Sequence, residues 1–354
     1  MYINAYSFIS AAGENHFKNE VALSKVKGRW AGSVDLPLVF DQRFQRDDRI
    51  VHLALHCARY IDFLPHLEPA LVNLASSRGA TATLEQYMKL FLSDGKLPPL
   101  VSPLTTAGRL SSTVADYLQV SGLVLDHSMT CSGGLQALMN AQQFLNSGKV
   151  EQALVGASEA CLTDFTFAQF DALRLYSQES DIACKPLIEK EHNTMVLGEG
   201  AGLFVLSNVR GPACRFRISG IGQGIEHAQH AVGLKGDNLI ASMEGAMLNA
   251  NAPSVDCVIA HAPGTILGDQ LEMAAIRSVL GDVPVISNKW KFGHTLAASG
   301  ILSIFWAMEL MKGWRPQVPE ALRAAHQAPD QINIVMVNAL GFGGNATSVL
   351  VERC

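Results

Sequence analysis

The chain has 354 residues, of which 48% are hydrophobic and 17% are charged, and it contains 30 glycines. This composition excludes a disordered chain and predicts an α/β protein with one large core or two smaller ones. The formal net charge of −5 argues against a broad nucleic-acid-binding surface, which needs an excess of basic residues.

The seven cysteines are odd in number, widely scattered and never in a Cys-x-x-Cys pair. This spacing excludes a zinc ribbon and argues against a disulfide framework, as expected in a reducing compartment. The first ten residues have neither the basic start nor the sustained apolar run of a signal peptide. The longest apolar helix, predicted over residues 298–311, is too short to span a bilayer. We therefore expect a cytoplasmic protein without a membrane span.

The first hundred residues predict one strand and two helices. The strand covers residues 2–10, and apolar positions at helical spacing predict a long amphipathic helix over 50–75. A second helix is predicted over 84–92, and the prolines between 98 and 103 predict a loop.

From residue 123 onward, a unit appears once in each half of the chain. It consists of a strand, a turn with a reactive side chain, a helix rich in small residues and another strand. In the first half, the predicted strands are 123–126, 152–157 and 201–207, and a helix ends at about 144. In the second half, the predicted strands are 257–260, 284–287, 333–338 and 347–351. The helices of the second half are predicted over 271–280 and 298–311. This repetition predicts two duplicated α/β halves, 1–209 and 210–354, which share one body and place their reactive turns against each other.

Cys131 lies in the first of these turns, between a strand and a helix. A thiol at a helix N-terminus is expected to have a lowered pKa, because the unpaired backbone N–H groups stabilise the thiolate. A lone cysteine in such a turn is more often a small buried apolar residue. The presence of His261 and His294 in turns of similar construction favours the catalytic interpretation.

A thiolate with two imidazoles suits acyl transfer, in which the cysteine holds an acyl group and the histidines donate to an enolate oxygen. A cysteine protease would instead need one histidine and an orienting Asn or Asp. The glycines in the segment Asn338-Ala-Leu-Gly-Phe-Gly-Gly-Asn345 allow backbone N–H groups to approach a substrate as an oxyanion hole. A tight β-turn explains these glycines equally well.

Taken together, these motifs resemble the β-ketoacyl-acyl-carrier-protein synthases of the thiolase superfamily, in particular the elongating type with a Cys-His-His triad. The resemblance runs from about residue 102 to the end and, more faintly, through the first strand. The segments that carry it, in chain order, are Thr130-Cys131-Ser132-Gly133, the glycine-rich stretch 196–202, Ala260-His261 through Glu272, Ser287-Asn288-Lys289 through Gly293-His294, and the final glycine loop 338–344.

The resemblance implies a thiolase-like fold with α-β-α-β-α layers and a set of residue roles. Cys131 would be the acylated nucleophile, and its amide and that of Phe342 would form the oxyanion hole, with Phe342 also acting as a gate. His261 and His294 would promote decarboxylation of a malonyl group. The remaining implied site residues are Lys289 for the electrostatics around His294, Glu272 as the anchor of the Lys289 loop, and Thr265, Gly341 and Gly343 for substrate binding.

No cofactor is implied, because the substrates of the family arrive on the phosphopantetheine of an acyl carrier protein. No metal is expected either: His227 and His230 are three residues apart, but no carboxylate or thiol lies at a matching offset. Arg43, Arg46 and Arg174 fall where the family docks the acidic carrier. The alternative for Arg43 and Arg46 is a solvated, salt-bridged surface beside nearby aspartates. A homodimer, or a heterodimer with a synthase homologue, is the expected assembly.

Some positions depart from the family pattern. Pro263 replaces a threonine that hydrogen-bonds the phosphopantetheine arm, Leu340 replaces an aromatic residue, and Asn345 replaces a threonine. These departures concern the substrate class rather than the triad. The segment from Asn288 to His294 resembles synthases of aryl-polyene or flexirubin-type pathways.

Two other functions remain open from the sequence. A non-condensing, chain-length-factor-like partner of another synthase usually lacks the nucleophilic cysteine, which this chain keeps as Cys131. A CoA-dependent, thiolase-like acyltransferase typically has a second cysteine in the last glycine loop, and here Cys354 lies ten residues beyond Gly344.

Overall fold

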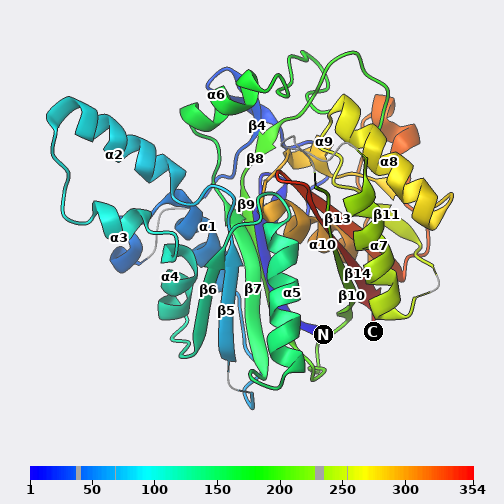
Figure 1. Cartoon of the computed structure of the whole chain (residues 1–354), viewed down its shortest axis with the longest axis horizontal. Helices are drawn as coiled ribbons and strands as arrows, with labels where there is room; N and C mark the ends of the chain where they lie inside the picture. The colour runs from blue at the N-terminus through cyan, green and yellow to red at the C-terminus, as the bar shows by residue number, and fades with distance from the viewer. Residues whose placement is uncertain (37–40, 68, 228–234, 253) are drawn as a thin grey trace.

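The computed structural model describes residues 1–36, 41–67, 69–227, 235–252 and 254–354. One twisted sheet runs through the molecule (Figure 1). The first half of the chain contributes β1 (Tyr2–Ser10), β5 (Pro69–Ala75), β6 (Leu123–His127), β7 (Gln152–Glu159) and β9 (Gly200–Ser207). The second half contributes β10 (Phe216–Ile225), β11 (Cys257–Ile259), β12 (Val285–Ile286), β13 (Ile334–Gly341) and β14 (Asn345–Arg353).

The two halves have the same strand order. The first half runs β6-β5-β7-β9-β1 and the second β12-β11-β13-β14-β10, so equivalent strands occupy equivalent places. The pairing directions also agree. β5 is parallel to β6 and β7, as β11 is to β12 and β13. β9 and β14 are each antiparallel to both of their neighbours. β1 and β10 then pair antiparallel and join the halves. The predicted duplication is confirmed.

Helices cover both faces of each half. α5 (Gly133–Asn146) and α10 (Ala298–Met311) pack together in a core that receives side chains from both halves of the sheet. α1 (Arg49–Ala58) and α4 (Arg109–Tyr117) cover the opposite face of the first half. α7 (Asp237–Ala250) and α8 (Ile266–Leu280) cover the opposite face of the second. The result is the predicted α-β-α-β-α layering (Figure 1).

Small residues allow the two central helices to approach closely. A Cβ on Gly134 would lie 2.6 Å from the Ala297 carbonyl oxygen, and one on Gly300 would lie 2.5 Å from Leu135 Cγ. Both positions therefore need glycine, since real Cβ atoms do not make contacts this short. The α5–α10 contact brings the turn that precedes α5 next to the turn that precedes α10.

A second, small sheet lies beside this contact. It consists of β3 (Ser24–Val26), β4 (Arg29–Gly32) and β8 (Leu197–Gly198), in that order. Leu197 also forms an isolated bridge with His294. The short strand β2 (Gly13–Glu14) pairs with β1 in the main sheet.

The prediction of one helix over residues 50–75 is wrong in its second part. α1 ends at Ala58, and residues 69–75 form strand β5, whose residues 71–75 are all buried. A parallel strand covered on both faces is apolar throughout and lacks the alternation that distinguishes strands from helices. β10 and α7 were not predicted from the sequence.

The other helices lie around the main layers. α2 (Thr81–Asp94) is longer than predicted, and α3 (Val101–Thr105) occupies part of the predicted proline loop. Pro103 lies within the first turn of α3, where the missing N–H has no helical acceptor. The remaining short elements are η1 (Gln42–Phe44), α6 (Asp164–Ala172), α9 (Lys289–Phe292) and η2 (Glu320–Ala325).

Candidate active site

Cys131 lies in the turn between β6 and α5, just before the helix-capping residue Ser132. Its side chain is buried, with 8% of the residue exposed. The preceding residue, Thr130, has a φ of 48°, in the left-handed region that a β-branched residue rarely adopts. The Gly134 amide donates to the Ala297 carbonyl at 3.2 Å and fixes the start of α5 against the turn before α10. The turn therefore presents the thiol in a strained but firmly held backbone.

The expected lowering of the Cys131 pKa is wrong for this structure. Burial and, to a smaller extent, the nearby Glu159 carboxylate raise the pKa of the thiol to about 12, while the Lys289 ammonium opposes the rise. The position at a helix N-terminus does not offset the loss of hydration. Cys131 is therefore a thiol at neutral pH when the site is empty, and its activation requires transfer of the proton to a neighbouring base.

His261 and His294 meet edge to face, with ring centroids 4.8 Å apart and planes at 87°. Burial and the charge of Lys289 lower the pKa of His261 to about 3. Burial, His261 and Lys289 together lower the pKa of His294 well below its usual value. Both imidazoles are therefore neutral at neutral pH, and each carries one N–H that can donate to a substrate oxygen.

The Nδ1 atoms of the two rings differ in their contacts. The His294 Nδ1 atom lies 3.3 Å from Ser299 Oγ on α10. Among the described residues, the buried His261 Nδ1 atom has no hydrogen-bond partner. A buried, unsatisfied nitrogen is costly in a structural histidine but expected in one that waits for a ligand.

Lys289 is the electrostatic link between these groups. It is buried in α9, and its ammonium donates to Asn288 Oδ1 at 2.8 Å. Burial lowers the pKa of Lys289 to about 8, while the charge of Glu272 opposes this shift. Its positive charge in turn lowers the pKa values of the two histidines and of Cys131.

Glu272, on α8, supports a different segment from the one expected. Its carboxylate accepts hydrogen bonds from the backbone amides of His261 and Ala262, each at 2.8 Å, and from Asn338 Nδ2 at 3.3 Å. Glu272 therefore anchors the turn of the first histidine, whereas it acts on Lys289 through its charge. Burial raises the pKa of Glu272 to about 7.

Glu159 is a fully buried carboxylate at the end of β7 and was not predicted from the sequence. It accepts hydrogen bonds from the amides of Ser77 at 2.8 Å, Arg78 at 3.2 Å and Ala297 at 3.3 Å. Burial raises the pKa of Glu159 to about 7. Its partners come from two distant segments, so no local pattern in the sequence could have indicated this residue.

The glycine loop lies against the nucleophile turn. Thr130 Oγ1 donates to the Phe342 carbonyl at 3.3 Å, and Asn345 Nδ2 donates to the same oxygen at 2.9 Å. A Cβ on Gly341 would lie 2.1 Å from Thr130 Oγ1. Gly343, with a φ of 91°, is exposed at the tip of the loop. The loop thus closes over Cys131, and the role of the Cys131 and Phe342 amides as an oxyanion hole stays a prediction.

The remaining predicted substrate residue, Thr265, is the N-cap residue of α8 and is half-buried. Its amide donates to Asp269 Oδ1 at 3.1 Å. Thr265 is therefore four residues beyond His261 and at the start of the helix that carries Glu272, and its role in substrate binding stays a prediction.

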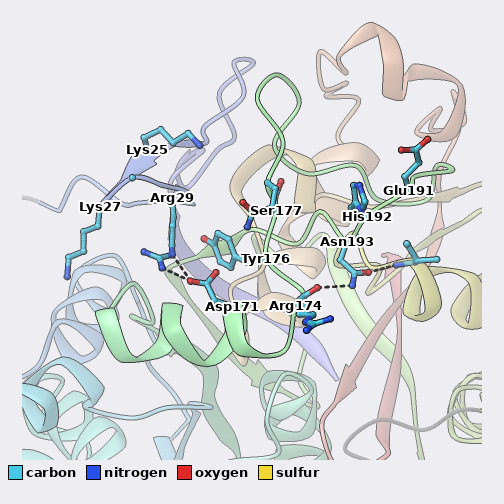
Figure 2. Close-up of a pocket in the computed structure, with 13 residues that line it drawn as sticks. Lys25, Lys27, Arg29, Asp171, Arg174, Tyr176, Ser177, Glu191, His192 and Asn193 are labelled. Atoms are coloured by element: carbon cyan, nitrogen blue, oxygen red, sulfur yellow. Dashed lines mark hydrogen bonds and ion pairs between the residues drawn. The ribbon is translucent and has the colours of Figure 1, made fainter.

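The three predicted docking arginines do not form one cluster. Arg43 pairs with Asp41 at 2.8 Å and lies 3.6 Å from Asp116 at the end of α4. Arg46 is exposed. Arg174 follows α6, away from α4 in Figure 1, and lines a separate cavity shown in Figure 2. The salt-bridged alternative describes Arg43 correctly, and docking by any of the three stays a prediction.

Within the described ranges of the chain, no group of three or more His, Cys, Asp or Glu side chains is arranged to hold a metal ion. None of the helices found there is both long and apolar enough to cross a bilayer. His230 lies outside the described residues.

Residues 68–210 match the family model of the beta-ketoacyl synthase N-terminal domain, and residues 215–319 match that of the C-terminal domain. The chain is 27% identical to the granaticin polyketide putative beta-ketoacyl synthase 1 of Streptomyces violaceoruber, over 93% of this chain and 89% of the relative. It is also 27% identical to 3-oxoacyl-[acyl-carrier-protein] synthase 2 of Staphylococcus aureus, over 80% of this chain and 74% of the relative.

A solved structure shows the same fold. The ketosynthase (ApeO) in complex with its chain length factor (ApeC) from Xenorhabdus doucetiae matches with a TM-score of 0.85 and 23% identity, over 100% of this chain and 98% of that chain. The fold is thus thiolase-like, and the family models cover the turns of Cys131, His261 and His294. The chain belongs to the β-ketoacyl synthase family and is an acyltransferase that forms carbon–carbon bonds.

Proposed function

We propose that the chain condenses a malonyl group, carried on the phosphopantetheine of an acyl carrier protein, with an acyl group held on Cys131. The observation that carries this proposal is the pair of neutral histidines, 4.8 Å apart and perpendicular, in the same buried site as a retained cysteine. Neutral imidazoles donate to an oxyanion without adding a positive charge that would have to be desolvated.

The first step loads the nucleophile. Cys131 Sγ attacks the thioester carbonyl of the acyl donor, the bond from that carbonyl to the pantetheine sulfur breaks, and the sulfur leaves with the proton. Because the thiol pKa is raised to about 12, this proton must move during the attack. A neutral imidazole is the acceptor that the site provides, and it returns the proton to the departing sulfur.

The second step generates the carbanion without a strong base. The bond from the malonyl Cα to its carboxylate breaks, CO2 leaves, and the electron pair moves into the thioester carbonyl as an enolate. The N–H groups of His261 and His294 would donate to this oxygen. The enolate carbon then attacks the acyl carbonyl on Cys131, the bond from that carbonyl to Cys131 Sγ breaks, and the thiolate takes a proton from solvent. The histidines act where negative charge develops, which lowers the barrier rather than the substrate Kd.

The assembly is proposed to be a dimer, homomeric or with a synthase homologue. The ketosynthase from Xenorhabdus doucetiae forms a complex with its chain length factor. In this chain, Leu84, Met88 and Leu92 are exposed along α2, and β6 ends the sheet with Leu123 and Val124 exposed. An apolar helix face and an open strand edge on one side of a protein support burial by a second subunit. Native mass spectrometry of the purified chain, alone and with a co-expressed homologue, distinguishes the two assemblies.

The chain-length-factor alternative predicts that Cys131 holds no acyl group. A non-condensing partner needs no nucleophile, whereas this chain keeps a cysteine in a strained turn against two neutral histidines. The CoA-dependent alternative has less support, because the loop 341–345 contains no second cysteine.

Intact-protein mass spectrometry tests the proposal. The chain is incubated with a panel of acyl-carrier thioesters, both aliphatic and aryl-primed, and the mass added to Cys131 identifies the donor and the pathway class. Cys131→Ala is the control and must take up no acyl group. Release of CO2 from malonyl-carrier protein, but not deprotonation of acetyl-CoA, is expected. Absence of both acylation and CO2 release across the panel would favour the non-condensing alternative.

A further inference from the structure

The connection between β13 and β14 is tied to the nucleophile turn by the side chain of Asn345. This residue begins β14, is buried, and pairs with Gly341 at the end of β13. Its Nδ2 atom donates to the Phe342 carbonyl at 2.9 Å, and its Oδ1 atom accepts from the Ser132 hydroxyl. The amide group of Asn345 therefore bridges the loop that carries Phe342 and the residue next to Cys131.

The neighbours of the Asn345 amide determine its orientation. A carbonyl oxygen can only accept a hydrogen bond, so the amide nitrogen must face Phe342. The amide oxygen then faces Ser132, whose hydroxyl supplies the proton. The same hydroxyl also lies 2.9 Å from the Met129 carbonyl oxygen, and its single proton serves one of the two acceptors at a time. The bond to Phe342 is therefore the half of the bridge that has no competitor for its proton.

The end of β13 packs directly against the nucleophile turn. A Cβ on Gly341 would lie 2.6 Å from Asn345 Oδ1 and 2.8 Å from the Met129 carbonyl oxygen. Thr130 Oγ1 also donates to the Phe342 carbonyl, at 3.3 Å. That carbonyl thus accepts one bond from the nucleophile turn and one from Asn345, and the bond from Asn345 is the shorter. The loop therefore has a fixed separation from the turn, and Asn345 makes the main contribution to it.

The opposite side of the loop is held by other segments. The Gly344 carbonyl accepts from the Glu226 amide at 2.8 Å and from Asn238 Nδ2 at 3.0 Å. Like Asn345, Asn238 is a buried asparagine that donates to a carbonyl of this loop, but it belongs to α7 and its bond ties the loop to that helix. A substitution of Asn238 therefore loosens the loop while the Asn345 bridge stays intact.

We propose that Asn345 is a positioning residue for acyl transfer, an inference that rests on the proposed function. It holds the backbone of Phe342 at a fixed separation from Cys131, so that the amides of these two residues donate to one thioester oxygen. Such donors are effective because they are already in place when the negative charge develops, and a loop that drifts from the nucleophile turn loses this advantage. Asn345 replaces a threonine of the family pattern, and its amide has separate donor and acceptor atoms where a threonine has one hydroxyl.

Two reactions of Cys131 separate positioning from access. Acylation by the hexanoyl thioester of N-acetylcysteamine develops negative charge on the acyl oxygen, whereas alkylation by iodoacetamide displaces iodide from a saturated carbon and develops none there. Asn345→Ala is expected to slow acylation by about 10-fold or more, short of the roughly 10²–10³ for outright loss of a donor, and to leave alkylation at the parent rate. Both rates are followed by intact-protein mass spectrometry.

Asn238→Ala is the matched control and should keep the parent rates of both reactions. Ser132→Ala breaks only the other end of the bridge, so it should slow acylation in the same direction, and it applies the same test if Asn345→Ala does not fold. The double variant should be no slower than Asn345→Ala alone, because the two side chains act through one contact.

Three results would each overturn the role of Asn345: acylation at the parent rate in Asn345→Ala, an equal change in acylation and alkylation, or equal slowing of acylation by Asn238→Ala. Amide hydrogen exchange of the peptide that contains Phe342 needs no turnover, and Asn345→Ala should speed it. If the parent chain takes up no acyl group while Asn345→Ala still speeds this exchange, the proposed function fails and the Asn345 bridge stands. Unchanged exchange would show that Asn345 does not hold the loop.

Discussion

In each half of the chain, a buried carboxylate holds one turn in place: the turn after β5 in the first half and the turn after β11 in the second. In the first half, the buried Glu159 carboxylate accepts from the amides of Ser77 and Arg78, which follow β5. In the second half, the buried Glu272 carboxylate accepts from the amides of His261 and Ala262, which follow β11. Burial raises both carboxyl pKa values to about 7. Yet only the second turn carries a member of the predicted triad.

The turns after β6 and β12, the next strand of each half along the chain, are different: both carry a member of the predicted triad. β6 leads to Cys131 and α5, while β12 leads through α9 to His294 and α10. A non-glycine residue with positive φ accompanies each turn, Thr130 at 48° and Leu296 at 43°. The duplicated topology therefore sets where the turns meet, and the side chains placed on them set the chemistry. Substitutions at six positions test this division.

The largest effect is expected at the turn after β6. Cys131→Ala should abolish condensation, because it removes the proposed nucleophile. It should leave the unfolding midpoint nearly unchanged, since alanine fills a similar small buried space. Condensation is measured by product formation from malonyl-carrier protein, and folding by circular dichroism. Residual condensation in this variant would show that another cysteine serves as the nucleophile.

The two histidines test whether turns from different strands act as one unit. His261→Ala and His294→Ala should each slow malonyl decarboxylation by roughly 10²–10³, the cost of losing one oxyanion donor. Acylation of Cys131 should survive at least partly in both, as followed by protein mass. Decarboxylation at the parent rate in either variant would remove that histidine from the proposed role.

Substitution of Glu159 and of Glu272 compares the equivalent carboxylates of the two halves directly. Glu159→Gln and Glu272→Gln should each lower the free energy of unfolding by about 1–3 kcal/mol, because an amide cannot accept all the hydrogen bonds of the carboxylate. Glu272→Gln should also slow decarboxylation, since it loosens the His261 turn. Glu159→Gln should lower the pKa of Cys131, whose rise Glu159 supports, and thereby speed alkylation of the thiol. Identical kinetic effects of both variants would contradict the division of roles.

Glu159 and Glu272 also make the free energy of unfolding depend on pH. Each pKa is raised from 4.5 in the unfolded chain to about 7 in the fold. The folded state therefore binds more protons between these values, and each group makes the fold less stable as pH rises from about 4.5 to 7, by about 3 kcal/mol in total. The lowered pKa of His261 acts in the opposite direction. The difference in unfolding free energy between parent and Gln variant, measured across this window, isolates the carboxylate contribution.

The sequence predicted those features that repeat or that have a local pattern. The helix over 298–311 has the predicted bounds, because it is apolar all round and lies wholly in the core. The triad residues were predicted from motifs and are found in adjacent turns. Glu159 and the raised pKa of Cys131 were not predicted, because both depend on burial by segments distant in the chain. The strand β5 was merged with a helix because a strand buried on both faces has no alternation.

The smallest effect is expected at Thr130, whose left-handed backbone costs about 1–2 kcal/mol for a residue with a Cβ. Thr130→Gly relieves this strain but removes the hydrogen bond to the Phe342 carbonyl and adds freedom to the unfolded chain. The net result should be a gain of at most about 1 kcal/mol in the free energy of unfolding, measured by urea denaturation, together with slower acylation of Cys131. Thr130→Ser keeps the hydroxyl and most of the strain, so it should retain near-parent stability and acylation. Thr130→Gly could instead be less stable than Thr130→Ser and be acylated at the parent rate. The backbone strain would then have no part in presenting the nucleophile. The turns of Thr130 and Leu296 would in that case share their topology alone.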